Sequence, residues 1–236
     1  MSVQYKRILL KLSGEALAGP KGAGFDEPTL QAICSGVRRA HELGVQIGIV
    51  VGGGNFWRGR TSGAMERTCA DKIGMLATVM NCLAVADALE QQGVSTCVMT
   101  AMAMPQVAEP FTRTNAVKNL QEGRIVLFGG GTGNPFFSTD SASALRAAEI
   151  GADAMFKATM VDGVYDKDPK KHPDAVKYDS LTFSRVLEDK RAVMDATAAA
   201  LCRDTHMPVL VFDMRDPANI ARAAQGEKIG TLVSED

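Results

Sequence analysis

Residues 126–140, with the sequence VLFGGGTGNPFFSTD, contain glycines, hydroxyl side chains and a single carboxylate. A short apolar run leads into three consecutive glycines, which supply no packing side chain and let the backbone turn sharply or approach a ligand closely. A phosphate is the usual ligand of such a loop, because freed N–H groups and the start of a helix attract anions, and residues 141–150 are predicted to form that helix. A tight turn capped by Thr139 or Asp140 is the other interpretation. This stretch alone does not decide between them.

Two more glycine loops follow apolar runs elsewhere in the chain. Lys11-Leu12-Ser13-Gly14 ends the first run, and Gly52-Gly53-Gly54-Asn55, followed by Arg58, ends the second. The carboxyl ends of parallel strands lie along one edge of a sheet, where such folds bind ligands, so the three loops are expected to converge on a phosphate-rich site. The chain has no Walker A motif and no GxGxxG after a strand, which argues against a Walker-type NTPase and an ordinary dinucleotide-binding fold.

Apolar runs alternate with segments of helical periodicity along the chain. This alternation predicts an α/β fold, a three-layer α/β/α sandwich with a central, mostly parallel sheet. Strands are expected at 8–12, 45–51, 94–100, 124–128, 154–158, 209–213 and 231–233, and helices at 28–43, 70–92, 141–150, 183–187, 192–204 and 217–224. Glycine-rich residues 13–24 and the stretch with Pro105 and Pro110 are expected to be loops.

The long helix expected at 70–92 is apolar on two faces. One face carries Ile73, Leu76, Met80 and Leu83, and the other carries Met75, Val79, Cys82 and Leu89. A helix apolar on two faces is normally buried on both. We therefore expect either the rest of the domain or a partner subunit to cover the second face, and its methionine content allows a partner.

Length and composition indicate one ordinary globular unit. The chain has 236 residues, 46% of them hydrophobic and 22% charged, with a net charge of −1, so a single domain over residues 1–236 is expected and broad nucleic-acid binding is not. Five cysteines without a CxxC pair favour reduced thiols and a cytoplasmic location, and the three histidines lack metal-ligand spacing. The opening apolar run is too short for a signal peptide, and no membrane association is expected.

Several motifs together resemble the bacterial uridylate kinases of the amino acid kinase superfamily. They are residues 11–17 (KLSGEAL), 52–55 followed by Arg58-Gly59, Asp71 with 74–81 (GMLATVMN), 132–140, and 157–164. The resemblance runs through essentially the whole chain in order, and the GTGNPFF stretch is close to diagnostic of the family. Small departures are Ser138, where threonine is common, and a shorter link between Arg58 and Asp71.

The resemblance implies transfer of the γ-phosphoryl group of ATP to UMP, with Mg²⁺ accompanying ATP, in pyrimidine nucleotide biosynthesis. It implies a homohexamer, with GTP as an activator and UTP as an inhibitor. It also implies that the part before about residue 151 mainly binds UMP and the part after it mainly binds ATP. Phosphoryl transfer requires chiefly positioning and charge neutralisation, which suits a site of glycines, lysine, arginine and one carboxylate.

The roles of single residues follow from the same resemblance. Catalysis is assigned to Lys11, Arg58 and Asp140, and Asp140 is also the residue expected to hold Mg²⁺, directly or indirectly. ATP is expected to contact Lys11, Leu12, Ser13, Gly14, Gly54, Arg58, Lys157, Thr159, Tyr165 and Asp168. UMP is expected to contact Gly53, Asp71, Thr132, Gly133, Asn134, Pro135, Phe136, Phe137, Ser138 and Thr139. The GTP-linked segment is Gly19, Pro20, Lys21, Gly22, Ala23 and Gly24, for which a flexible loop is the plainer interpretation.

Three other functions share some of these features. A carbamate or acetylglutamate kinase shares the fold and the Lys11-type loop, but residues 132–140 argue against it. A non-catalytic anion-storage protein on the same scaffold is disfavoured because Lys11, Arg58, Asp71 and Asp140 are all retained. A nucleotide-responsive regulator is a third alternative, for which the sequence offers no separate DNA-binding segment.

Overall fold

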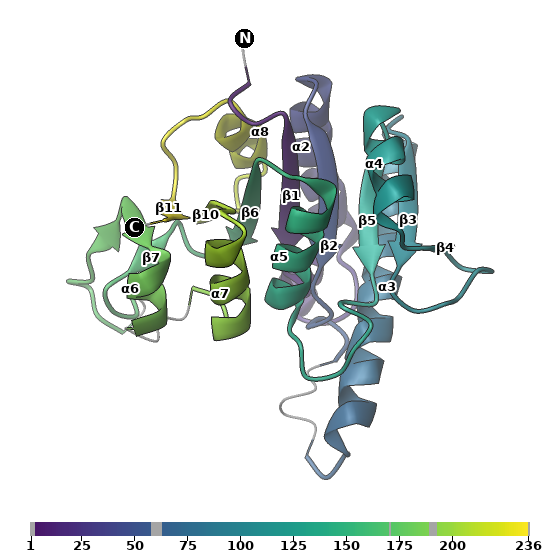
Figure 1. Ribbon diagram of the computed structural model, residues 1–236, viewed down its shortest axis with the longest axis horizontal. Helices are drawn as coiled ribbons and strands as arrows, with labels where there is room; N and C mark the ends of the chain where they lie inside the picture. The colour runs from purple at the N-terminus through teal and green to yellow at the C-terminus, as the bar shows by residue number, and fades with distance from the viewer. Residues whose placement is uncertain (1–2, 58–62, 170, 189–192, 236) are drawn as a thin grey trace.

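The computed structural model describes residues 3–57, 63–169, 171–188 and 193–235 (Figure 1). Nine strands form one sheet in the order β4-β3-β5-β2-β1-β6-β10-β11-β9. These strands are β1 Arg7–Leu12, β2 Gln46–Val51, β3 Thr96–Thr100, β4 Glu109–Pro110, β5 Ile125–Gly129, β6 Ala154–Thr159, β9 Ser180–Thr182, β10 Val209–Asp213 and β11 Thr231–Ser234. Every neighbouring pair is parallel except β10 and β11, so the predicted mostly parallel sheet is confirmed.

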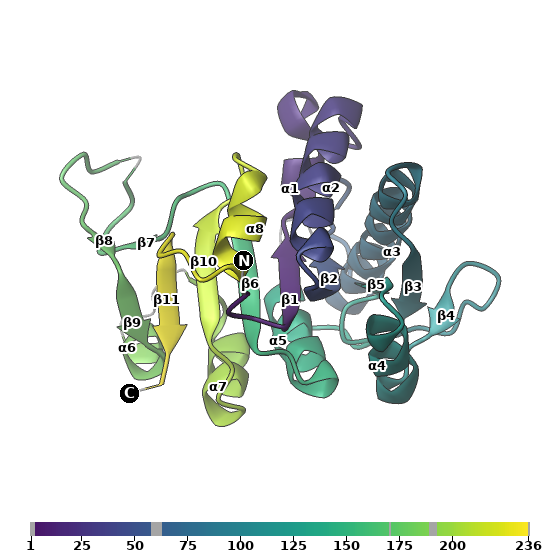
Figure 2. The same ribbon diagram turned by 90° about the horizontal axis from the view of Figure 1, so that it is seen from above.

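Helices cover both faces of the sheet, which confirms the predicted three-layer sandwich (Figure 2). One layer contains α1 Gly14–Leu17, α2 Glu27–Glu42, α3 Arg67–Gln91 and α8 Ala218–Ala224. The opposite layer contains α4 Arg113–Gln121, α5 Thr139–Ile150, α6 Phe183–Glu188 and α7 Ala196–Asp204. A small hairpin of β7 Val164–Tyr165 and β8 Lys177–Tyr178 lies beside the main sheet.

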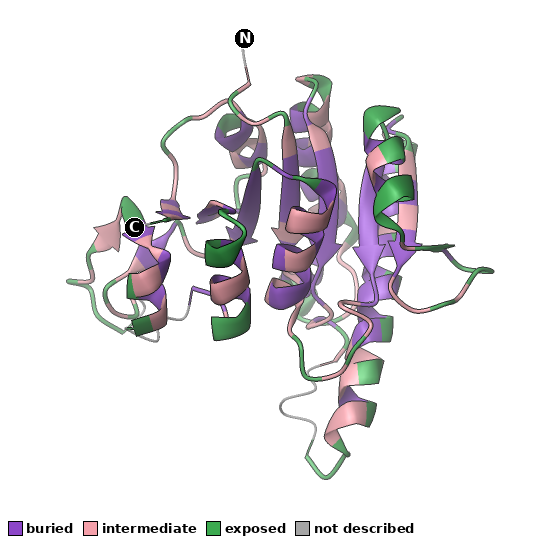
Figure 3. Ribbon diagram, viewed as in Figure 1, coloured by how far each residue is buried: buried purple, intermediate pink, exposed green. Residues whose placement is uncertain are grey.

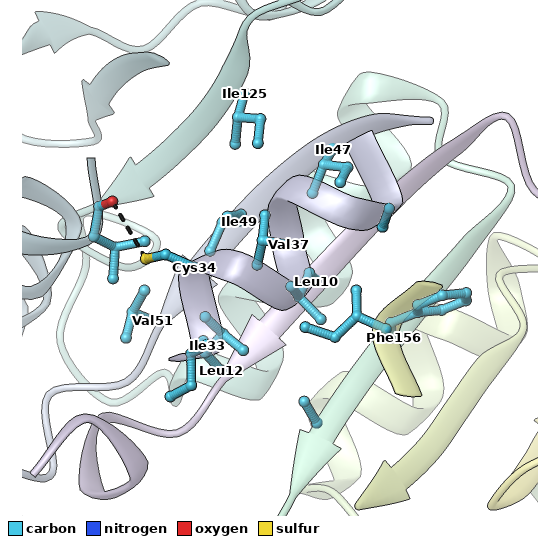
Figure 4. Close-up of a cluster of buried hydrophobic side chains, with 14 of the residues drawn as sticks. Leu10, Leu12, Ile33, Cys34, Val37, Ile47, Ile49, Val51, Ile125 and Phe156 are labelled. Carbon is cyan, nitrogen blue, oxygen red and sulfur yellow. Dashed lines mark hydrogen bonds between the residues drawn. The ribbon is translucent and has the colours of Figure 1, made fainter. Parts of the chain in front are cut away.

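The two halves of the core follow from the alternation of side chains along the strands. Leu10 of β1 belongs to the core beneath α2, whereas its neighbour Leu9 belongs to the core beneath α5, and both are fully buried. Figure 4 shows the first core, in which Cys34 and Val37 of α2 lie over Leu10 and Ile49. Because both faces of the sheet are covered, a strand must be apolar at successive positions. The continuous apolar runs of the sequence predicted such a sheet.

Helix α3 is covered by this chain on one face only. Met75, Val79, Cys82 and Leu89 are buried, and the helix packs against β2, β3 and β5. On its other face Leu76, Met80 and Leu83 are 49%, 46% and 38% exposed, and Figure 3 shows exposed residues along the part of α3 that projects beyond the sheet. By length and composition α3 could cross a membrane, but 56% of its most apolar window is buried, as in the core helix of a globular protein.

Several short elements differ from those expected from the sequence. Helix α4 and strand β4 lie in the stretch that the prolines suggested was a loop, and β7, β8 and β9 were not anticipated. Residues expected to form a glycine-rich loop instead contain α1 and a 3-10 helix, Gly19–Lys21. These elements span only two to nine residues each, so their periodicity is weak.

All five cysteines are free, as predicted. Cys34, Cys82, Cys97 and Cys202 are buried, whereas Cys69 is exposed. Burial raises the pKa of Cys34, Cys82 and Cys202 to about 12, which keeps these thiols protonated and unreactive.

Candidate active site

The three glycine loops lie at one edge of the sheet. Strands β1, β2 and β5 are parallel neighbours, so the loops that follow them leave the sheet on the same side. The first two loops are in close contact, because a Cβ atom added at Gly14 would lie 2.1 Å from the carbonyl oxygen of Gly52. A Cβ atom added at Gly52 would lie 3.5 Å from Oγ1 of Thr139, at the start of α5. Gly14 is therefore required for the close approach of two loops, because any larger residue would collide with backbone.

Two lysines and one aspartate meet at this edge. Lys11 of β1 and Lys157 of β6 are register partners on adjacent strands, so their ammonium groups are held close together. Asp140, in the first turn of α5, pairs with both: its Oδ1 lies 3.2 Å from Nζ of Lys11, and its Oδ2 lies 2.5 Å from Nζ of Lys157. The three side chains are only 11% to 16% exposed, so their charges compensate one another with little screening by water.

This arrangement shifts the pKa of two of the three groups. Burial by itself would raise the pKa of Asp140, but the attraction of Lys11 and Lys157 outweighs burial and places that pKa below its usual range. Burial lowers the pKa of Lys157; Asp140 opposes this shift and Lys11 adds to it. Asp140 is therefore ionised at neutral pH, and Lys157 releases its proton more readily than an exposed lysine.

The helix that carries Asp140 is capped by Ser138, so a cap at Thr139 or Asp140, one of the two interpretations of this stretch, is wrong. Oγ of Ser138 accepts the N–H groups of Asp140 and Ser141 at 3.0 and 3.2 Å. A phosphate at the start of α5 would thus find these two N–H groups already occupied. Backbone donors for a phosphate are therefore expected mainly from the glycine loops. Among the described residues, the N–H groups of Gly53, Gly54 and Gly131 donate to no protein acceptor.

Asp195, which was not predicted as a site residue, holds the start of α5 in place. Its carboxylate accepts the hydroxyl of Ser138, the hydroxyl of Ser141 at 3.0 Å and the N–H of Ala198 at 3.0 Å. Asp195 is thereby the cap of α7. The signal was present, an aspartate directly before an alanine-rich helix, but the helix was expected to begin at residue 192 and so enclosed its own cap.

The residue two positions before Asp195 contacts the cluster directly. The carbonyl oxygen of Val193 accepts a hydrogen bond from Nζ of Lys157, at 2.5 Å. The segment that leads into α7 therefore braces both Lys157 and the helix that carries Asp140.

A cavity of about 210 Å³ opens on one side of the cluster. Predicted UMP contacts that line it are Gly53, Asp71, Thr132, Asn134, Phe137, Ser138 and Thr139, and the predicted ATP contact Gly54 lines it too. Gly133, Pro135 and Phe136 lie outside its lining. Trp57, for which no role was predicted, also forms part of the wall.

The carboxylate of Asp71 already has two partners in this structure. Arg67 donates its Nε to both oxygens at 2.9 and 2.8 Å, and the N–H of Phe136 donates to Oδ2 at 2.8 Å. Phe136 has a positive φ of 73° and a 64% exposed side chain. Asp71 thus ties the start of α3 to the 132–138 loop, a contact that its predicted role with a ribose did not include.

A larger cavity of about 770 Å³ opens on the other side. The predicted ATP contacts Lys157, Thr159, Tyr165 and Asp168 all line it. The hydroxyl of Tyr165 donates to Oδ1 of Asp162 at 2.6 Å, which fixes the ring in the loop after β6. Leu12, Ser13 and Gly14, also predicted to contact ATP, lie instead at the end of β1 beside Lys11, outside this lining.

Arg58 was also predicted to belong to the site, and residues 19–24 to be linked to GTP. Arg58 lies outside the described residues. The segment of Gly19, Pro20, Lys21, Gly22, Ala23 and Gly24 begins with a 3-10 helix and ends in two hydrogen bonds to Asn55, one through the N–H of Gly24 at 3.1 Å and one through its carbonyl oxygen at 2.9 Å. The segment is therefore attached at Gly24 to the glycine loop after β2.

The charged cluster connects the linings of the two cavities. Thr139 lines the smaller one, and its neighbour Asp140 pairs with Lys157, which lines the larger one. Two ligands bound in the two cavities could thus present anionic groups to the same pair of lysines. In the parts of the chain that the structure describes, no three His, Cys, Asp or Glu side chains gather into a metal site.

Comparison with known proteins relates this geometry to a family. The family model of the amino acid kinases matches residues 6–213. The fold is similar to a crystal structure of UMP kinase from Bacillus anthracis, at 40% identity over 98% of this chain and 97% of that chain, with a TM-score of 0.95. It is also similar to UMP kinase from Ureaplasma parvum (35% identity, all of both chains, TM-score 0.92) and to uridylate kinase from Archaeoglobus fulgidus (30% identity, 96% and 99%, TM-score 0.74).

Asp140→Asn is expected to lower the free energy of unfolding by about 3 kcal/mol at neutral pH, because it leaves two buried ammonium groups without their anion. Since the folded-state pKa of Asp140 lies below its usual 3.8, this contribution is complete above that value and is lost as the pH falls through the folded-state pKa. Urea unfolding of both proteins at several pH values measures the difference, which should shrink in acid.

The matched control is Glu42→Gln, which removes the anion of the exposed Arg38–Glu42 pair and should cost under about 1 kcal/mol. A stability difference for Asp140→Asn that is no larger than that of the control, or that grows in acid, would contradict the assignment.

Proposed function

The chain belongs to the amino acid kinase family, and from that membership we propose that it is a UMP kinase, which transfers the γ-phosphoryl group of ATP to UMP and yields UDP and ADP in pyrimidine nucleotide biosynthesis. The observation that carries the proposal is the Lys11–Asp140–Lys157 cluster, which connects the linings of two cavities. A kinase must bring a donor and an acceptor, both rich in negative charge, to one place. The names of the similar structures add support.

The lysines neutralise the charge that crowds together when two phosphate groups meet. Each ammonium group stabilises negative charge on the transferring phosphoryl group in a site that water screens poorly. Asp140 keeps the two ammonium groups in place before the substrates bind and compensates their mutual repulsion. It is not needed as a general base, because the acceptor phosphate has a second pKa of about 6 and is already largely ionised at neutral pH.

The smaller cavity is assigned to UMP. The N–H groups of Gly53, Gly54 and Gly131, which donate to no acceptor among the described residues, are suitable donors to its phosphate. Asp71 would accept hydrogen bonds from the ribose hydroxyls with lone pairs that Arg67 and Phe136 leave available, since a carboxylate offers about four acceptor sites. Thr132 to Thr139 would surround the base, and Arg58 would grip the phosphates with its planar guanidinium group.

The larger cavity is assigned to ATP. Its volume of about 770 Å³ exceeds that of the smaller one, as the larger nucleotide requires. Tyr165 would pack near the base, while Lys157 and Lys11 would reach the phosphates. We accordingly propose one domain over residues 1–236, in which the part before about residue 151 mainly binds UMP and the part after it mainly binds ATP.

Mg²⁺ is proposed to enter with ATP. Oδ1 of Asp140 is buried and, although it lies 3.2 Å from Lys11 Nζ, it accepts no well-aligned hydrogen bond, so one carboxylate oxygen fits such an ion directly or through water. Lysines surround Asp140, and the described residues contain no group of three His, Cys, Asp or Glu side chains that could bind a metal. Both observations agree with an ion held mainly by phosphate oxygens. When bound, Mg²⁺ supplies further charge neutralisation.

A homohexamer is proposed from the family resemblance and from the open face of α3. Leu76, Met80 and Leu83 form an apolar stripe on that face, and an exposed apolar stripe is typical of a protein interface. GTP activation linked to residues 19–24, inhibition by UTP and a cytoplasmic location are further proposals that the resemblance supports. The free thiols agree with that location.

The acceptor preference tests the main proposal. A coupled assay of ADP release is expected to show turnover with UMP well above that with CMP, AMP, GMP or carbamate, because residues 132–139 surround the base of UMP. Asp140→Asn should reduce turnover at least about 100-fold, since it disturbs the charges at the transferring group. Preference for AMP or carbamate would refute the proposal, and no turnover with any acceptor would favour the storage alternative.

The pH dependence tests the role of Lys157. Its pKa lies below the ordinary 10.5, so the kcat/KM of the wild type should fall on the alkaline side before an ordinary lysine would titrate. Lys157→Arg stays charged throughout this range, and its alkaline decline should move to higher pH even if its maximum is lower. Lys118→Arg, at an exposed lysine, should leave the profile unchanged. An unshifted decline in Lys157→Arg would exclude Lys157 as its origin.

Light scattering tests the oligomer. The wild type is expected to be a hexamer at micromolar concentration, and Met80→Glu combined with Leu83→Glu should yield smaller species, because charge on the apolar stripe opposes burial. The control is Val176→Glu, an exposed apolar residue elsewhere in the chain. A monomeric wild type would contradict this proposal.

A further inference from the structure

Helix α3 buries two polar side chains on the face that packs against the sheet. Thr78 is 3% exposed and Asn81 is fully buried, three residues further along the helix. Residues at this spacing lie on the same face of a helix. Polar groups in such positions are costly unless they are hydrogen-bonded, so their partners show what they do.

Thr78 holds the glycine loop after β5. Its hydroxyl donates to the carbonyl oxygen of Met75 at 2.6 Å and accepts the N–H of Gly130 at 2.9 Å. Gly130 has a positive φ of 78°, at the point where the chain turns away from the strand. One hydroxyl therefore fixes the first turn of this loop against the helix.

Asn81 holds the glycine loop after β2. Its Nδ2 donates to the carbonyl oxygen of Gly52 at 2.6 Å and to Oδ1 of Asn55 at 2.8 Å. Asn55 donates in return to Oδ1 of Asn81 at 3.0 Å and to the carbonyl oxygen of Gly24 at 2.9 Å. The two amides thus form a closed pair, and one buried residue of α3 orients the whole Gly52–Asn55 turn.

The backbones of both loops also lie close to α3. A Cβ atom added at Gly53 would be 2.9 Å from the carbonyl oxygen of Gly74, and one added at Gly129 would be 3.1 Å from Cγ2 of Val79. Both loops therefore begin close to the helix, and the hydrogen bonds of Thr78 and Asn81 hold them there. The N–H groups of Gly53, Gly54 and Gly131, in these two loops, donate to no acceptor among the described residues and so are available to a ligand.

We propose that Thr78 and Asn81 are positioning residues, which set the two glycine loops at the distance and orientation that phosphate binding requires. This inference rests on the proposed function, because the loops are assigned to the phosphates of UMP and ATP. Thr78 also lines the smaller cavity, but its hydroxyl is already bonded to Met75 and Gly130. Both residues therefore act through backbone N–H groups that neither of them supplies. A displacement of reacting groups by about 1 Å costs on the order of 100-fold in rate, so small changes in these loops have large effects.

The decisive comparison is Thr78→Val against Thr78→Ser. Valine has the shape of threonine but cannot accept the N–H of Gly130, whereas serine keeps the hydroxyl. Thr78→Val is expected to lose about 10- to 100-fold in kcat/KM for UMP, and Thr78→Ser should stay within about threefold of the wild type. Asn81→Ala is expected to behave like Thr78→Val.

A control separates positioning from stability alone. Asn119 is a buried asparagine of α4 that donates to the carbonyl oxygen of Asn115 at 2.8 Å, away from both cavities. Asn119→Ala should lower the melting temperature as Asn81→Ala does, yet leave kcat/KM of the folded enzyme near that of the wild type. If Asn81→Ala does not fold, the Thr78 pair still decides.

A spectroscopic measurement adds a readout that does not need turnover. Trp57 is the only tryptophan of the chain and lines the smaller cavity, so its fluorescence should report UMP binding. UMP titrations should give weaker binding for Thr78→Val than for Thr78→Ser. Equal kcat/KM and equal UMP affinity in these two variants, beside an active wild type, would overturn the positioning role alone; a wild type without UMP turnover would refute the proposed function itself.

Discussion

The site depends on the compensation of two lysines by one aspartate. The register of β1 and β6 places Lys11 beside Lys157, and two ammonium groups shielded from water repel each other strongly unless an anion lies near them. Asp140 supplies that anion from a different element, the first turn of α5. The compensation leaves a net positive charge, so the cluster is stable without a ligand and still attracts phosphate groups.

The placement of Asp140 in turn depends on α7. Asp195 accepts from Ser138, the residue that caps α5, and Val193 accepts from Lys157. A carboxylate that caps one helix while binding the cap of another fixes the relative position of both helix starts. Asp195 and Val193 therefore support the ion pairs through hydrogen bonds. These bonds orient the side chains that would contact a ligand.

Helix α3 fixes the glycine loops on the opposite side of the sheet from α5 and α7. Its buried face is mostly apolar, but the hydroxyl of Thr78 and the amide of Asn81 form hydrogen bonds with the loops from that face. Its open face carries an apolar stripe. One helix thus supports the proposed phosphate site on one side and offers a surface for association on the other. The charged cluster and the loops meet at the same edge because parallel strands end there.

The sequence by itself determined the layered architecture, the long elements and the positions of the glycine loops, because strand and helix periodicity and glycine triplets are local signals. Lys11 and Asp140 each stand next to such a loop, and the family resemblance assigned their roles. The structure decided what depends on distant parts of the chain. The register that pairs Lys11 with Lys157, the brace from Asp195 and the contacts of Thr78 and Asn81 join residues far apart in the sequence. Strands as short as β4 and β7 exist only because a neighbouring strand supplies their hydrogen bonds. A local sequence pattern does not identify a partner that is distant along the chain, because sequence spacing does not specify distance in space.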